Sequence, residues 1–248
     1  DIEGVYLECH MTEPVYMSVS GRVLVELLIL YPRMKKFLHN GTLYVKLLRA
    51  LYGLPMSGFL WYTKLKNVLI NLGYKMSNKD PCVFINECDK DNIRRAGIHG
   101  DDILVICNNL DLVNKECERI GSKFTNYKVS DNNNFKHLGM VINRNENRDV
   151  NITMSKYILD ILKEYSIDES SKYPHDNNLF SKDNSDQVSE ILRKNYHSII
   201  YKLLFIAKRC RPDILLNISY LSSYVNDCSY TNCKYLVKLL QYLSRTVN

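Results

Sequence analysis

The chain has 248 residues, of which 46% are hydrophobic and 24% are charged, and this composition excludes a disordered protein. The net charge of +6 permits nucleic-acid binding, and the longest apolar run, residues 23–31, is far shorter than the ~20 residues of a membrane span. The eight cysteines show no zinc spacing, which indicates a reduced intracellular protein. Because the sequence opens on Asp1 rather than Met, we expect a piece of a longer chain without a signal peptide.

Hydrophobic periodicity predicts the elements in chain order. Over 1–9 we expect a strand that runs into a helix or turn, followed by strands over 15–17 and 43–48. Helices are expected over 23–38 and 57–72, the second of which ends at Gly73. Strands follow over 82–85, 96–99 and 103–107, then a helix over 112–124. A hairpin of 135–142 and 150–154 is expected across the polar stretch 143–149, with a helix over 155–165 that has Ser155 as its N-cap. The last helices are expected over 199–207, 214–225 and 232–243.

The composition changes after residue 165. Residues 166–195 are rich in Ser, Asp, Asn and Lys, with one short helical pattern near 188–192, which is typical of a connector or a long surface loop. The sequence therefore predicts a mixed α+β protein with a domain over 1–165, a polar connector over 166–195 and a helical subdomain over 196–248.

Two adjacent carboxylates, Asp101 and Asp102, follow His99 and Gly100 at a turn between two apolar strands. Two carboxylates at a hairpin tip repel each other, and a divalent cation relieves that repulsion. The alternative is an ordinary hairpin in which Gly and Asp serve only the turn geometry. The rest of the sequence favours the metal.

Asp1 and Tyr6 lie on the first predicted strand, and with them the chain begins to resemble the reverse transcriptase domain of copia-type retrotransposons. The resemblance extends over essentially the whole chain. Its blocks are KLLRALYGLPMSGFLWY at 46–62, DPCVF at 80–84, KHLGM at 136–140, the stretch 196–214 that ends in RPDI, and the stretch 235–246. Their order and spacing together are specific, although each block alone is only moderately so.

The resemblance implies a right-hand polymerase: an antiparallel palm sheet with packed helices, partial fingers, and a small helical thumb or connection. It implies two Mg²⁺ ions, with Mn²⁺ as a substitute, held by Asp1 and Asp101, with Asp102 as an auxiliary catalytic carboxylate. The nucleotide-binding residues that it implies are Tyr6, which excludes a ribose 2′-OH, Gly53 and Ser57. The implied primer- and template-binding residues are His99, Gly100, Leu138 and Gly139.

The partners that the resemblance implies are an RNA template, a DNA primer and deoxynucleotides, with no membrane. It also implies that the chain belongs to a Pol polyprotein with RNase H and integrase, and that copying takes place in cytoplasmic virus-like particles. The reaction that the resemblance implies is an in-line attack of a primer 3′-OH on an α-phosphate, the activity of an RNA-directed DNA polymerase.

Several of these residues have simpler interpretations. Tyr6 on an alternating strand also suits a core aromatic. Gly53 and Ser57 suit a turn and a helix start. Trp61 is interpreted as a core anchor rather than a stacking platform. Four cations are candidates for phosphate contacts, although charges on helix faces are usually only solvated: Lys46, Arg49, Lys64 and Lys66.

The sequence departs from the family pattern at a few positions. His99 and Gly100 stand where the family has Tyr-Val, Met56 stands where it has Gln, and we expect the upstream finger strands to lie outside this sequence. Three rival functions stay open: a decayed or co-opted remnant that only binds nucleic acid, an RNA-dependent RNA polymerase, and a non-catalytic interaction module. Tyr6 as a sugar gate favours a DNA polymerase over an RNA polymerase.

Overall fold

The computed structural model of the chain describes residues 1–87, 92–130, 133–147, 149–176, 178–180 and 185–247. The chain forms two compact units, Asp1–Val129, which has two sheets, and Ser130–Asn248, which has one, and no hydrophobic core of these described residues is shared between them. The compact units thus divide within the predicted 1–165 domain, because Met154 and Ile158 are buried in the core of the second unit. The functional division into 1–165, 166–195 and 196–248 stays a prediction. Residues 177 and 181–184 of the predicted connector, and residue 148 of the predicted 143–149 loop, lie outside the described residues.

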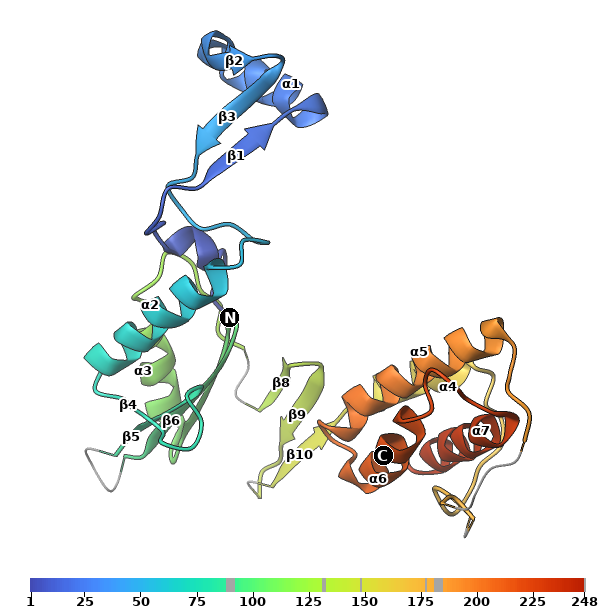
Figure 1. The fold of residues 1–248 in the computed structure, drawn as a ribbon. Coiled ribbons are helices and arrows are strands. Elements are labelled where there is room, and N and C mark those ends of the chain that lie inside the picture. The colour runs from blue at the N-terminus through green and yellow to red at the C-terminus, as the bar shows by residue number, and fades with distance from the viewer. Residues whose placement is uncertain (88–91, 131–132, 148, 177, 181–184, 248) are drawn as a thin grey trace. The chain divides into compact units, whose positions relative to one another are not determined.

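The main sheet of the first unit is antiparallel and carries the predicted site. Its strands are, in spatial order, β4 (Lys75–Met76), β5 (Val83–Asn86), β6 (Arg94–His99) and β7 (Asp102–Cys107), and the helices that pack with it are α2 (Ser57–Asn71) and α3 (Leu110–Gly121) (Figure 1). Alternate strand positions point to the same face. Phe84, Ala96 and Ile98 therefore share one buried core with α2. The predicted strands and helices of this region are confirmed to within a few residues.

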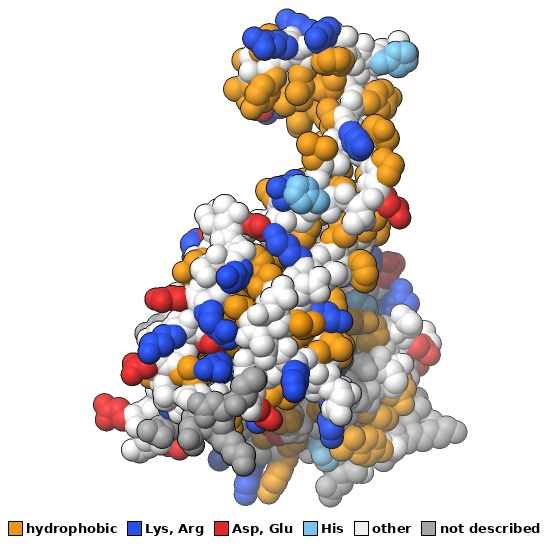
Figure 2. All heavy atoms as spheres, turned by 90° about the vertical axis from the view of Figure 1, so that its left-hand side faces the viewer, with side chains coloured by type: hydrophobic (Ala, Val, Ile, Leu, Met, Phe, Trp, Pro, Cys, Tyr) orange, Lys and Arg blue, Asp and Glu red, His pale blue; other side chains and the backbone are white. Residues whose placement is uncertain are grey.

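A smaller sheet in the same unit consists of β1 (Tyr16–Val19), β3 (Thr42–Lys46) and β2 (Leu38–His39), packed with α1 (Gly21–Leu30) around Val19, Leu24 and Leu43. The predicted helix over 23–38 is wrong beyond Leu30. Pro32 has a fixed φ and no N–H, so it cannot continue the helix, and the chain proceeds as the 3₁₀ helix η2 (Pro32–Phe37). Hydrophobic side chains lie on the surface of this part beside Lys and Arg (Figure 2).

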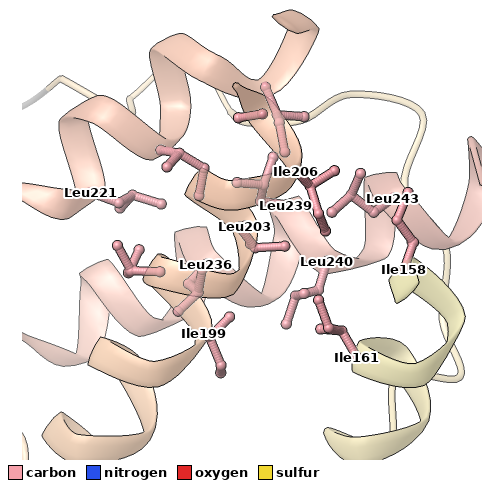
Figure 3. Packing of buried hydrophobic residues seen from close by; sticks show 14 of the residues in the cluster. Ile158, Ile161, Ile199, Leu203, Ile206, Leu221, Leu236, Leu239, Leu240 and Leu243 are labelled. Carbon is pink, nitrogen blue, oxygen red and sulfur yellow. The ribbon is translucent and has the colours of Figure 1, made fainter. Parts of the chain in front are cut away.

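The second unit combines a three-stranded sheet with a helical core. The sheet has β8 (Asn134–His137), β9 (Met140–Arg144) and β10 (Val150–Thr153), and the helices are α4 (Ser155–Glu164), α5 (Glu190–Ala207), α6 (Leu215–Ser222) and α7 (Tyr230–Arg245), with η3 (Pro212–Ile214) before α6. Leucine and isoleucine side chains from α4, α5, α6 and α7 converge in its core (Figure 3). The predicted helices are confirmed. Helix α5 starts earlier than predicted because Ser189 caps it, accepting a hydrogen bond from the N–H of Leu192.

Three further local predictions differ from the structure. The strand expected at the start of 1–9 is only a single bridge between Ile2 and Tyr127, whereas the helix or turn expected after it is present as the 3₁₀ helix η1 (Val5–Glu8). The strand expected over 135–142 is divided into β8 and β9 by a two-residue turn. Ser155 is the first residue of α4 rather than its N-cap, and its hydroxyl donates to the carbonyl of Val247 instead. Among the described residues, no helix has both the length and the apolar character needed to cross a membrane.

Candidate active site

The predicted metal-binding carboxylate Asp101 lies at the tip of the hairpin formed by β6 and β7. His99 pairs with Asp102, so Gly100 and Asp101 form a two-residue turn, which we call the 100–101 turn. Only Gly100 of the two has a positive φ, 61°. This is the type II′ arrangement, which favours Gly at the first central position. Gly100, which stands where the family has Val, is therefore the residue that this turn geometry prefers.

Asp1 lies beside the same turn, because the residue that follows it is bonded to Asp101. The N–H of Ile2 donates to the carbonyl oxygen of Asp101 at 3.2 Å. On the other side, the N–H of Lys128 donates to the carbonyl of Asp1 at 2.9 Å, and the backbone nitrogen of Asp1 donates back to the carbonyl of Lys128 at 3.1 Å. The structure thus brings the backbones of Asp1 and Asp101 together from segments that are far apart in the sequence.

The carboxylates at this place have the chemistry of a magnesium site. Asp1 and Asp101 are exposed, Asp102 is half-buried, and in the described part of the chain none of the three forms an ion pair. No group of three or more His, Cys, Asp or Glu able to hold a metal occurs among the described residues. Mg²⁺ usually takes one or two carboxylates and completes its shell with water and substrate phosphates. A pair of carboxylates without a cationic partner fits that kind of site.

Trp61 of α2 contacts the 100–101 turn directly. Its indole Nε1–H donates to the carbonyl oxygen of Gly100 at 2.6 Å, and the ring is only 2% exposed. The ring also packs against Phe124, with their centroids 5.3 Å apart. Its interpretation as a core anchor is confirmed, whereas the hydrogen bond to the turn was not expected. The one available signal was that a buried Trp usually finds an acceptor for its N–H.

Tyr6, the predicted sugar gate, lies on η1 and contacts a second aromatic residue. Its ring meets that of Tyr52 edge to face, with their centroids 4.5 Å apart. Tyr52 is 67% exposed and directly precedes Gly53, whose φ is 91°. The structure therefore brings Tyr6 to the predicted nucleotide-binding turn, and Tyr52 is a residue of this place that the sequence did not single out.

Ser57, the third predicted nucleotide contact, has a partner within the protein. It is buried, and its hydroxyl donates to the carbonyl of Leu51 at 2.6 Å. This bond closes the turn that contains Gly53 onto the start of α2. Ser57 therefore has a structural role here, and its contact with a nucleotide stays a prediction.

An ionic clamp joins the first residues to α2. The Glu8 carboxylate accepts from Lys64 Nζ at 2.8 Å and from the backbone N–H of Thr125 at 2.9 Å. These two hydrogen bonds, first of all the one from Lys64, lower the pKa of Glu8 to about 2. Lys64 thus has a carboxylate partner within the protein, whereas its position on a helix predicted either a contact with phosphate or simple exposure to solvent. This role of Glu8 was not predicted, because the sequence around Glu8 gives no sign of an ion-pair partner 56 residues away.

The other predicted primer-binding residues, Leu138 and Gly139, belong to the second unit. They form the turn between β8 and β9, which we call the 138–139 turn, with φ values of 50° and 84°. Two positive φ values define a type I′ turn. Arg209 Nε donates to the carbonyl of Leu138 at 3.0 Å, and the Arg209 guanidinium lies 3.6 Å from the ring centroid of Phe205.

Comparisons with known proteins identify the family of the chain. Residues 1–175 match the family described as reverse transcriptase (RNA-dependent DNA polymerase). The retrovirus-related Pol polyprotein from transposon RE1 of Arabidopsis thaliana is 23% identical over 100% of this chain, and the putative transposon Ty5-1 protein of Saccharomyces cerevisiae is 25% identical over 99% of it. The chain spans 16% of the first relative and 75% of the second. No solved structure matches the chain.

The order of the sequence blocks had implied the copia-type family, and the matched relatives confirm that resemblance. Reverse transcriptase domains generally depend on a divalent metal, in keeping with the carboxylate pair at the 100–101 turn. The chain belongs to the reverse transcriptase (RNA-dependent DNA polymerase) family, a class of nucleotidyltransferase.

Proposed function

We propose that this chain transfers deoxynucleotides from dNTPs to the 3′-OH of a DNA primer on an RNA template. The observation that carries the proposal is the hydrogen bond from the N–H of Ile2 to the carbonyl of Asp101. It brings together the backbones of two residues whose carboxylates are exposed, and neither carboxylate has a cation partner among the described ion pairs. Such a pair needs a divalent metal to be neutralised, and phosphoryl transfer uses metals held in this way.

Asp1 and Asp101 hold two Mg²⁺ ions in this proposal, and Mn²⁺ substitutes for them. The bound ions supply activation of the primer 3′-OH and stabilisation of charge on the leaving pyrophosphate. Asp102 adds a third negative charge next to the pair. The tight 100–101 turn keeps the protein narrow at this tip, which leaves room for the primer end.

Nucleotide selection falls to the aromatic pair and the turn beside it. The Tyr6 ring, held at its edge by Tyr52, lies under the sugar and leaves no space for a 2′-oxygen, so discrimination comes from a clash. Gly53 allows the backbone to approach the nucleotide closely. Ser57 shapes that approach through its bond to Leu51.

The parts of the molecule receive the roles of a right-hand polymerase. We assign the β4–β7 sheet with α2 and α3 to the palm, the β1–β3 sheet with α1 to part of the fingers, and α5 to α7 to a thumb or connection. His99 and Gly100 on one unit, and Leu138 and Gly139 on the other, contact the primer and template. In the parent polyprotein, RNase H and integrase complete the copying and integration of the element, and copying takes place in cytoplasmic virus-like particles.

The test is extension of a labelled DNA primer annealed to an RNA template, with Mg²⁺ or Mn²⁺ and with deoxy- or ribonucleotides in parallel. We expect deoxynucleotide extension that Asp101→Asn reduces at least about a thousandfold, because the metal site loses a charged ligand. Asp160→Asn, which neutralises an exposed carboxylate on α4, is the matched control and should extend normally.

Three results would overturn the proposal. Extension that persists in Asp101→Asn removes the metal role of the turn. Ribonucleotide incorporation above deoxynucleotide incorporation makes the chain an RNA polymerase. Salt-dependent binding of template–primer with no extension leaves a remnant that only binds nucleic acid.

A further inference from the structure

Both carbonyl oxygens that flank the Asp101 Cα accept hydrogen bonds from outside the hairpin. The carbonyl of Gly100 accepts from the indole N–H of Trp61 at 2.6 Å, and the carbonyl of Asp101 accepts from the N–H of Ile2 at 3.2 Å. The two donors come from α2 and from the residue that follows Asp1. The backbone on each side of Asp101 is therefore held by a different element.

The bond to Gly100 has a specific consequence for the turn. Types I′ and II′ share a positive φ at the first central residue and differ by a flip of the peptide group between the two central residues. That flip would turn the Gly100 carbonyl to the opposite face and give Asp101 a positive φ. Asp101 has no positive φ in the structure, as expected for the II′ form. The Trp61 N–H therefore bonds the Gly100 carbonyl in the orientation that this carbonyl has in a II′ turn.

Trp61 is well suited to fix a peptide orientation, because its own side chain is buried and packed on its ring face. The side chain is 2% exposed and lies in the same buried core as Leu65 and Ile98, with Phe124 against its ring. Its N–H is its one polar group. Leaving that donor unpaired in the core costs about 1–3 kcal/mol, so the flipped turn is disfavoured from the Trp side as well.

We propose that Trp61 is a positioning residue for the metal ligand Asp101. Its indole N–H holds the 100–101 turn in the II′ form, which directs the Asp101 carboxylate toward Asp1. This inference rests on the proposed function, because it requires Asp1 and Asp101 to share a metal site. A core anchor needs only the volume of the Trp ring, whereas a positioning residue needs its N–H.

The experiment measures binding of Mn²⁺ alone, by the loss of the free-ion electron paramagnetic resonance signal, without a polymerase assay. Trp61→Phe keeps an aromatic ring and removes the donor, and we expect the Mn²⁺ dissociation constant to rise about tenfold, as for other residues that orient a metal ligand. Phe124→Leu disturbs the same packing without touching Gly100. It should lower the melting temperature and leave the dissociation constant within about twofold.

Asp101→Asn distinguishes failure of the proposed metal site from failure of the positioning role of Trp61. If it leaves Mn²⁺ binding unchanged, the proposed metal site fails and the inference fails with it. If Asp101→Asn weakens binding but Trp61→Phe does not, only the positioning role is overturned. An equal loss of binding in Trp61→Phe and Phe124→Leu also overturns it, because general loosening of the core then explains the result.

A near-isosteric variant keeps the inference testable if Trp61→Phe fails to fold. Trp61 is the only tryptophan of the chain, so replacing it with 3-benzothienylalanine changes one N–H to sulfur and little else. We expect the same tenfold loss of Mn²⁺ affinity with this residue. Unchanged affinity in the folded benzothienyl protein contradicts the role of the N–H.

Discussion

The 100–101 turn and the 138–139 turn both connect neighbouring antiparallel strands with two residues, but they are stabilised in opposite ways. The first places Gly at its single position of positive φ, so the backbone is unstrained. The second places Leu138 at a φ of 50°, where a side chain costs about 1–2 kcal/mol. Local sequence therefore keeps the first turn free of backbone strain, whereas the second turn depends on its surroundings to offset that strain.

The surroundings of the 138–139 turn offset that strain. Arg209 donates to the carbonyl of Leu138 and lies over the ring of Phe205, and that ring lies against the backbone of Gly139. A third turn of the same type provides an internal reference: Asn40 and Gly41 have φ values of 47° and 74°, and an added Cβ at Gly41 would meet nothing within 4 Å. Asn tolerates the left-handed region, so that turn needs no external support.

The largest change in stability is expected from Gly139→Ala in the 138–139 turn. The new Cβ would lie 3.1 Å from the Phe205 ring, which is held by Arg209 and Tyr157, and the residue would keep a φ of 84°. We expect the second unit to lose about 2–3 kcal/mol of its free energy of unfolding, from the backbone cost and the overpacking together. Urea denaturation followed by the helical circular dichroism signal measures the loss.

Gly41→Ala is the matched control for that change, because it adds the same methyl at a similar φ in open space. It should cost only about 1 kcal/mol. Equal losses in the two variants would show that contact with Phe205 contributes nothing to the 138–139 turn.

Acid distinguishes the supports of the two turns. Glu8 and Lys64 clamp η1 to α2, and so tie together the two segments that bond the 100–101 turn, whereas Arg209 holds its turn through a carbonyl and a ring that do not titrate. The pKa of Glu8 is lowered to about 2 in the folded protein from an ordinary value of 4.5. Its stabilisation is therefore complete above pH 4.5 and is lost as the pH falls toward 2.

We expect this loss to reach about 1–2 kcal/mol for the first unit, below the full linkage value because solvent screens the pair. The fluorescence of the single Trp61 reports that unit in urea titrations at several pH values. Glu8→Gln should be less stable than the wild-type protein at neutral pH and show a smaller change between pH 4.5 and 2. Parallel curves for the two proteins would exclude Glu8 as the acid-sensitive group.

Sequence reasoning succeeded where local pattern decides the structure. The apolar residues on both sides of the turn, such as Ile98 and Ile103, predicted the hairpin, and the Gly-Asp pair predicted its turn. It also placed Asp1 with Asp101, through the resemblance rather than through any local signal. The sequence-based prediction failed where single residues override the hydrophobic pattern. Pro32 ends a helix although the helical spacing of apolar residues continues beyond it. Leu138 and Gly139, both with a positive φ, form a turn within a segment whose pattern predicted one continuous strand.

The contacts of Trp61, Glu8 and Arg209 could not be predicted, because each has its partner 39 to 71 residues away in the sequence. Periodicity identifies which face of a helix is buried but not which carbonyl a buried donor will reach. The roles of Tyr6, Gly53 and Ser57 remain predictions, and the structure adds Tyr52 to that group as the ring against which Tyr6 lies.

A smaller effect is expected from Gly100→Ala. An added Cβ would meet nothing within 4 Å, so only the φ of 61° opposes the substitution. We expect a loss of about 1 kcal/mol from the first unit, measured by Trp61 fluorescence in urea. Gly58→Ala on α2, which also adds a methyl in open space but at an ordinary helical φ, should instead stabilise by up to about 1 kcal/mol. Losses of the same size in both variants would mean that the 100–101 turn does not require a positive φ.

The smallest effect, and the one of opposite sign, is expected from Leu138→Asn. This substitution gives the 138–139 turn the Asn-Gly sequence that the 40–41 turn already has, at nearly the same φ values. Relief of the left-handed strain outweighs the loss of a half-buried leucine, so we expect a gain of about 0.5–1 kcal/mol in the second unit, seen as a higher urea midpoint. Repeating the substitution in an Arg209→Gln background tests the role of Arg209 directly. If Arg209 compensates for strain at Leu138, Arg209→Gln should lower the free energy of unfolding less when residue 138 is Asn than when it is Leu. An equal cost in both backgrounds would show that Arg209 stabilises the turn independently of its backbone strain.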